Sequence, residues 1–115
     1  MSYRLLIAIL ADTGAVDRTL EAFAAAGLPG ATVIDGRGMR EHRSSALSLF
    51  AGFRTAFAAV GHSQVVLALI ETERAAEALA TCRTAAELDQ PGTGLAFLIE
   101  VTAAVGVALR DEAVG

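Results

Sequence analysis

The stretch that decides the fold is Tyr3–Leu10, which reads YRLLIAIL. It is rich in branched apolar residues and is followed by the turn and capping residues Asp12-Thr13-Gly14, so it predicts a β-strand. Successive residues of a strand point to opposite faces, and here both faces are apolar. One face carries Tyr3, Leu5, Ile7 and Ile9, and the other carries Leu6, Ala8 and Leu10. The strand therefore needs cover on both sides.

The segments that follow complete a regular order of elements. Three further strands are predicted at Ala31–Gly36 (ATVIDG), Gln64–Ile70 (QVVLALI) and Leu95–Val101 (LAFLIEV). Helical spacing from Val16 ends at Gly27 and Pro29, and a second helix over Glu73–Leu88 stops at Asp89-Gln90-Pro91-Gly92. The order βαββαβ predicts an α+β, ferredoxin-like fold with a four-stranded antiparallel sheet and two helices on one face. We expect one domain over residues 1–115.

The connection between the second and third strands, Arg37–Gly61, is long for two strands that a tight hairpin would join. Its first part is charged and contains Arg37, Arg40 and Arg43, whereas its second part contains Phe50, Phe53 and Phe57. Connections of this length in compact domains are usually functional or mobile. The phenylalanines, at helical spacing, favour a packed loop helix over a ligand-stacking cage.

The third predicted strand is also apolar on both faces, because Val65, Leu67 and Leu69 alternate with Val66, Ala68 and Ile70. Two helices cover only one face of a sheet, and a solvated face would show polar residues. We therefore expect the second face to meet another subunit in a homo-oligomer.

The composition excludes several classes of protein. The chain is 54% hydrophobic and 19% charged, with a net charge of -4 and a pI near 5.0, which argues against disorder and against nucleic-acid binding. All nine basic residues are arginine, so neither a P-loop lysine nor a Schiff-base lysine exists. Apolar runs fall short of the roughly 20 residues of a spanning helix. We expect a cytoplasmic protein that neither binds nucleic acid nor inserts into a membrane.

Few residues carry a chemical signal. The loop Pro91-Gly92-Thr93-Gly94 lets backbone N–H groups approach an anion, although a plain glycine turn from helix to strand is the simpler explanation. The loop arginines suit a phosphate or carboxylate, or else form a solvated face. Glu41, His42 and His62 suggest a metal site or an acid–base pair, but lack a short ligand spacing and are more simply polar loop residues. Cys82 is most simply a core residue.

Two runs of the sequence resemble the PII signal-transduction family and its PII-like relatives. They are Gly30–Met39 (GATVIDGRGM) and Pro91–Val101 (PGTGLAFLIEV), and the likeness extends from Tyr3 to about Ala108. The resemblance implies trimers with the sheets facing inward, adenine nucleotides bound in clefts between subunits, and a long T-loop that contacts a transporter or an enzyme.

Four residues carry over onto the family's binding positions: Thr32, Gly38, Gly92 and Gly94. Other positions depart from the pattern. Leu95 replaces the lysine after the second glycine, Gly106 and Ala108 stand at two arginine positions, and Thr93 replaces an aspartate. The T-loop lacks the family's modifiable tyrosine, because Tyr3 is the only tyrosine. With these cations missing, a mononucleotide or a small anion such as bicarbonate suits the cleft better than tightly bound ATP.

The resemblance predicts a trimeric PII-like regulator, not an enzyme, that needs no cofactor and regulates a membrane transporter or an enzyme through loop 37–61. The expected ligand site comprises eight residues: Thr32, Arg37, Gly38, Met39, Arg40, Gly92, Thr93 and Gly94. Two alternatives remain open: a small α+β enzyme or metal-binding trimer that uses His42, Glu41 and His62, and a purely structural assembly with an empty cleft.

Overall fold

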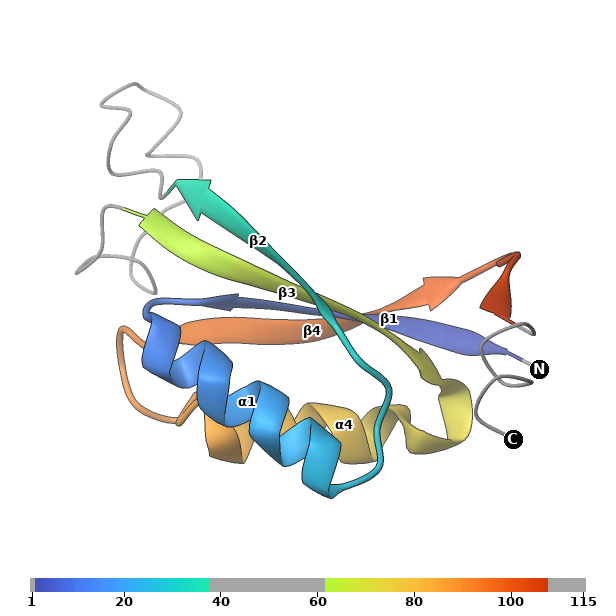
Figure 1. Ribbon diagram of the computed structural model, residues 1–115, viewed down its shortest axis with the longest axis horizontal. Helices are drawn as coiled ribbons and strands as arrows, with labels where there is room; N and C mark the ends of the chain where they lie inside the picture. Colours follow the sequence, from blue (N-terminus) through green and yellow to red (C-terminus); the bar gives the residue numbers. More distant parts are fainter. Residues whose placement is uncertain (1, 38–61, 108–115) are drawn as a thin grey trace.

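The computed structural model describes residues 2–37 and 62–107. Its elements follow the predicted order (Figure 1): β1 (Tyr3–Leu10), α1 (Thr13–Ala25), β2 (Thr32–Arg37), β3 (His62–Glu71), α4 (Thr72–Ala85) and β4 (Gly94–Val101). The predicted α+β, ferredoxin-like fold is confirmed. Most of the long connection, residues 38–61, lies outside the described residues, so the predicted loop helix stays a prediction.

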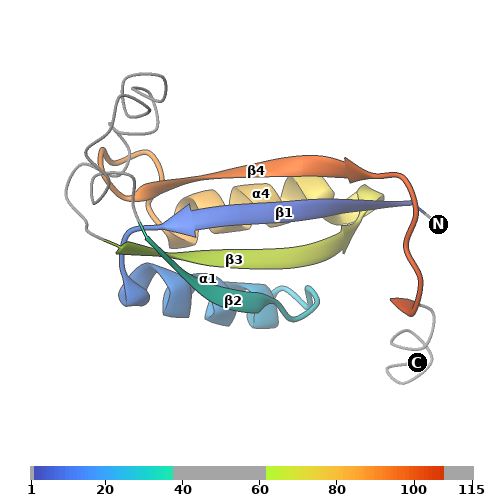
Figure 2. The ribbon, with the colours of Figure 1, turned by 90° about the horizontal axis from the view of Figure 1, so that it is seen from above.

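The four strands form one antiparallel sheet in the order β2-β3-β1-β4. The two helices lie side by side on one face of it, and the other face carries no helix of the described chain (Figures 1 and 2). Strands β2 and β4 are therefore the two edges of the sheet. No helix in the described residues is long and apolar enough to cross a membrane.

Local hydrogen bonds and backbone conformation explain where α1 begins and where α4 ends. The carboxylate of Asp12 accepts a hydrogen bond from the N–H of Ala15 at 2.7 Å and caps the start of α1. The second helix ends at Ala85, three positions earlier than the sequence predicts. Beyond it, Glu87 adopts a left-handed conformation with φ of 56°, and the N–H of Leu88 bonds back to the carbonyl of Arg83. This turn ends the helix although the residue types still favour one.

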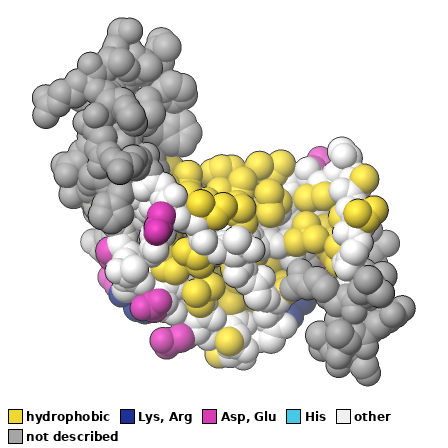
Figure 3. Space-filling model, turned by 45° about the horizontal axis from the view of Figure 1, so that its top comes forward, with side chains coloured by type: hydrophobic (Ala, Val, Ile, Leu, Met, Phe, Trp, Pro, Cys, Tyr) yellow, Lys and Arg dark blue, Asp and Glu magenta, His cyan; other side chains and the backbone are white. Residues whose placement is uncertain are grey.

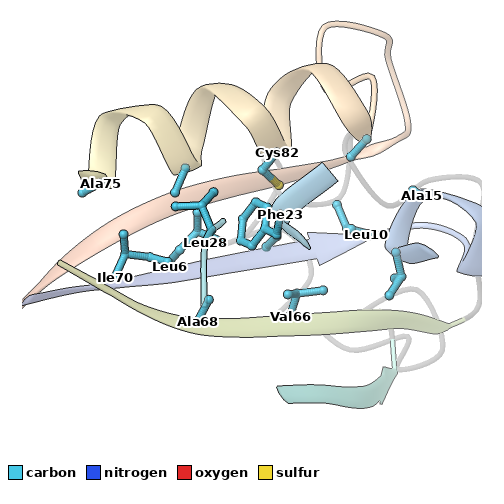
Figure 4. Packing of buried hydrophobic residues seen from close by; sticks show 14 residues of the cluster. Leu6, Leu10, Ala15, Phe23, Leu28, Val66, Ala68, Ile70, Ala75 and Cys82 are labelled. Carbon is cyan, nitrogen blue, oxygen red and sulfur yellow. The ribbon is translucent and has the colours of Figure 1, made fainter. Parts of the chain in front are cut away.

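The core lies between the helices and one face of the sheet (Figure 4). Alternate residues of β1 and β3 are almost completely buried there, against Phe23 of α1 and Cys82 of α4. These strand residues are Leu6, Ala8, Leu10, Val66, Ala68 and Ile70. We call this side the covered face. Its residues are those that the alternation in the sequence predicts.

The intervening residues form the opposite side, which we call the open face. The register aligns most of them in three rows across the sheet: Leu95–Ile9–Val65–Ile34, Phe97–Ile7–Leu67–Thr32 and Ile99–Leu5–Leu69. A further row, Val101–Tyr3–Glu71, lies at the end of this face. None of the side chains in the three rows is charged, and Ile34, Phe97 and Ile99 are 47%, 36% and 43% exposed. Figure 3 shows hydrophobic side chains gathered over the sheet. Such a continuous apolar surface is typical of an interaction site.

Candidate functional site

The glycine loop before β4 has a backbone that requires glycine at one position. Gly94 has φ of 136°, and an added Cβ would collide with the carbonyl oxygen of Ile9 in the neighbouring strand. Gly92 also has a positive φ, of 79°, but an added Cβ there would meet open space. The close approach of β4 to β1 thus explains Gly94 without a ligand. Gly92 lies in the turn before the strand.

Thr93 holds this loop in shape. Its hydroxyl lies 2.9 Å from the carbonyl oxygen of Glu87 and 3.0 Å from that of Gln90, to which it donates. Its own carbonyl accepts a hydrogen bond from the N–H of Ala11 at 2.9 Å. Because the hydroxyl has one proton and uses it inside the loop, the side chain of Thr93 has no proton left to donate to a ligand.

The cationic side chains beside this loop are already engaged. Arg83 pairs with Asp89 at 2.8 Å, and this hydrogen bond raises the pKa of Arg83. Arg18 donates to the carbonyl of Ala85 at 2.8 Å and lies 3.4 Å from the carboxylate of Glu87. Leu95, in the family's lysine position, belongs to the open face. The described surroundings of the loop therefore supply little positive charge to a polyphosphate.

The other predicted site residues lie on or after β2. Thr32 begins the strand opposite Leu67 and is exposed at the edge of the open face. Arg37 ends it opposite His62, and the side chains of these two residues are not described. Gly38, Met39 and Arg40 lie outside the described residues, as do Glu41 and His42 of the alternative site.

The sheet order separates the two halves of the predicted site. The register places Gly94, Leu10, Gln64 and Asp35 in one row, so that Gly94 and the end of β2 lie at the same end of the sheet. They stand at opposite edges, however, with β1 and β3 between them. Three strand spacings amount to about 14 Å. Among the described residues, Thr32 and Gly94 therefore lie too far apart for one small ligand to contact both within a single chain.

A polar pair that sequence reasoning missed lies beside the end of β2. The amide nitrogen of Gln64 donates to the carboxylate of Asp35 at 3.0 Å. The amide oxygen of Gln64 is buried and accepts no hydrogen bond within residues 2–37 and 62–107. The only signal in the sequence is a glutamine at the start of an otherwise apolar strand.

Cys82 lies in the core, where the sequence analysis places it. Its side chain is buried, and burial raises the pKa of its thiol, partly offset by a hydrogen bond with Thr19. A thiol in these surroundings is a poor nucleophile, because the thiolate is the reactive form. Residues 2–37 and 62–107 contain no group of three or more His, Cys, Asp or Glu side chains suited to hold a metal ion.

No protein-family model matches the chain, and no curated protein matches it in sequence. Among solved structures, the chain is similar to the crystal structure of Arabidopsis thaliana PII bound to citrate, with a TM-score of 0.65. The two sequences are 17% identical, and the match covers 87% of this chain and 78% of that chain. At this identity the likeness concerns the fold. The chain therefore has a ferredoxin-like fold of the PII kind.

Proposed function

We propose that the chain is a PII-like regulatory protein that assembles as a homotrimer and binds a mononucleotide or a small anion in the cleft between subunits. In this proposal it regulates a transporter or an enzyme through loop 37–61. The observation that carries the proposal is that the described ligand residues are divided between the two edges of the sheet, with Thr32 on β2 and Gly94 on β4. A ligand contacts both groups only where β2 of one copy lies beside β4 of the next.

The open face supports the same assembly. The three rows of uncharged side chains, which are apolar except for Thr32, would lose contact with water if the sheets of several copies faced a common axis. A head-to-tail arrangement, β4 edge against β2 edge, closes into a ring when the rotation between copies fits. The PII fold and the resemblance of the two sequence runs favour three copies.

The charges favour a small ligand. Leu95 and the exposed Gly106 supply no cation, and Arg18 and Arg83 are paired within the chain. Citrate in the PII structure of similar fold is itself a small carboxylate anion. We therefore expect AMP, citrate or bicarbonate to bind at least as tightly as ATP.

Sedimentation equilibrium tests the assembly. We expect three times 11.8 kDa for the wild-type chain, and a monomer for Phe97→Glu, which buries a charge in the proposed interface. Ala80→Glu adds the same charge on the exposed side of α4 and should leave the trimer intact. A wild-type monomer at micromolar concentration would exclude the proposal.

Titration calorimetry with AMP, ATP, citrate and bicarbonate tests the ligand site. Loss of a charge-assisted hydrogen bond in Arg37→Ala should weaken binding of the preferred anion about 10- to 100-fold. Thr32→Val should weaken it less. Binding of ATP at sub-micromolar concentration that survives Arg37→Ala would contradict this description of the cleft.

A further inference from the structure

One carboxylate lies between the two predicted ligand residues of β2. Thr32 begins the strand and Arg37 ends it, and Asp35 stands two positions before Arg37. Residues two positions apart in a strand occupy the same face, with their Cα atoms about 7 Å apart. Asp35 and Arg37 therefore share one face of β2, which is the outermost strand on its side of the sheet (Figure 2). Asp35 is exposed there, and the predicted anion site does not include it.

Gln64 holds this carboxylate in place. It lies directly opposite Asp35 in the register of β2 and β3, and its amide nitrogen donates to a carboxylate oxygen of Asp35 at 3.0 Å. The amide oxygen of Gln64 is buried. Turning the amide over would bring this oxygen against the carboxylate, so the amide has one favourable orientation. The negative charge of Asp35 is thus fixed beside the end of β2 that carries Arg37.

The other charges beside the glycine loop cancel in pairs. The loop lies at the same end of the sheet as Asp35, because the register aligns Gly94 and Asp35 in one row. Two ion pairs flank the loop, Arg18–Glu87 and Arg83–Asp89. Within the described part of the chain, the ligand cleft therefore receives one positive charge from Arg37 and one negative charge from Asp35.

The effect of Asp35 depends on the charge of the ligand. In the proposed trimer, the end of β2 faces the glycine loop of the next copy. An anion that contacts Arg37 lies within about 10 Å of Asp35, and over this distance charges still interact at moderate salt. Because the Coulomb energy is proportional to the product of the two charges, the repulsion is greater for ATP than for AMP.

We propose that Asp35 is a specificity-determining residue of the anion cleft, which favours ligands of low charge, such as AMP or bicarbonate, over polyphosphates such as ATP. Asp35 acts by repulsion and without contact with the ligand. The inference rests on the proposed function, because it assigns a role at the same cleft. It adds a residue that opposes a chain of phosphates to the absence of cations at Leu95 and Gly106.

AMP and ATP test the proposal because they differ only in the number of phosphates. Titration calorimetry compares the wild-type chain with Asp35→Asn, in which an amide oxygen can still accept the hydrogen bond from Gln64. We expect Asp35→Asn to tighten ATP binding about tenfold and AMP binding by no more than about threefold. Raising the salt from about 50 mM to about 500 mM should shrink the gain for ATP. Equal gains for the two nucleotides, or no gain for ATP, would overturn the proposal.

Two further variants separate the local charge from other effects. Asp35→Glu keeps the charge and should keep the wild-type ratio of the two affinities. Glu21→Gln removes one negative charge from the exposed side of α1, in the helix layer, and should also keep this ratio. A gain for ATP in Glu21→Gln equal to that in Asp35→Asn would overturn the proposal, because the net charge of the chain would then explain both.

The same titrations distinguish this inference from the proposed function. Binding that weakens in Arg37→Ala but does not respond to Asp35→Asn would overturn the role of Asp35 and leave the anion cleft in place. No binding of either nucleotide to the wild-type chain or to Asp35→Asn at millimolar concentration would overturn the nucleotide cleft and the role of Asp35 together.

Discussion

The covered and open faces of the sheet carry similar side chains in different surroundings. Leu6, Ala8 and Leu10 of β1 are fully buried beneath α1 and α4, whereas their neighbours Leu5, Ile7 and Ile9 retain contact with solvent. The difference arises from the helices alone, because the strand is apolar on both sides. One face is completed within the chain, and the other is completed, in our proposal, by further copies.

The largest expected effect separates these two faces within one strand. Leu6→Ala leaves a cavity in the core and should lower the free energy of unfolding by about 2–5 kcal/mol at every protein concentration. Leu5→Ala, one residue away on the open face, should cost less at low concentration and more as the concentration rises and the trimer forms. Urea unfolding at two protein concentrations measures both. Equal, concentration-independent losses would show that the open face has no subunit partner.

The sequence predicts the two faces well because alternation along a strand is a local property. The buried residues of β1 and β3 follow from this alternation, because the two helices pack against only one apolar face of the sheet. The early end of α4 was not predictable from residue types, since it depends on the left-handed conformation of Glu87.

The candidate site was harder to predict, because it depends on which strands become neighbours. Thr32 and Gly94 were identified by type, but their positions at opposite edges follow from the sheet order. The hydroxyl of Thr93 donates to backbone carbonyls three and six residues before it, and the guanidinium of Arg18 donates to the carbonyl of Ala85 at the end of the other helix. Such bonds leave no pattern in the sequence.

The second prediction concerns the glycine loop, which is held within one chain like the covered face. Gly94→Ala should lower the free energy of unfolding by about 1–3 kcal/mol, because alanine is strained at φ of 136° and its Cβ collides with the carbonyl of Ile9. Gly92→Ala, where an added Cβ meets open space, should cost less. Thermal unfolding at low concentration compares the two. A milder effect at Gly94 than at Gly92 would contradict this account of the loop.

The third prediction concerns the helices that form the cover. Asp12→Ala removes the side-chain cap of α1 and should lower the free energy of unfolding by about 1 kcal/mol. Glu71 holds the same position in α4 without a side-chain cap, so Glu71→Ala should change the value by less than about 0.5 kcal/mol. Urea unfolding of both variants gives the comparison. Equal losses would mean that the cap of Asp12 contributes nothing beyond a general effect of removing a carboxylate.

The smallest effect is a pH dependence from the thiol beneath the covered face. Burial raises the pKa of Cys82 in the folded chain, whereas the unfolded chain has an ordinary thiol. As the pH rises through the ordinary thiol pKa, the unfolded chain releases a proton that the folded chain keeps, so the free energy of unfolding falls. The free energy of unfolding therefore keeps its full value below the thiol pKa of the unfolded chain. It falls as the pH rises from that pKa to the raised pKa of Cys82 in the folded chain.

Urea unfolding between pH 7 and pH 10, under reducing conditions, should show this decline. Cys82→Ala has no thiol and should show a shallower decline over the same range, whatever its stability at pH 7. The titratable residues at the end of the open face, Tyr3 and Glu71, are the same in both chains, so the difference in slope reports the thiol. Identical slopes for the two chains would mean that the thiol titrates alike in the folded and unfolded states, and that the covered face is more accessible to water than its packing indicates.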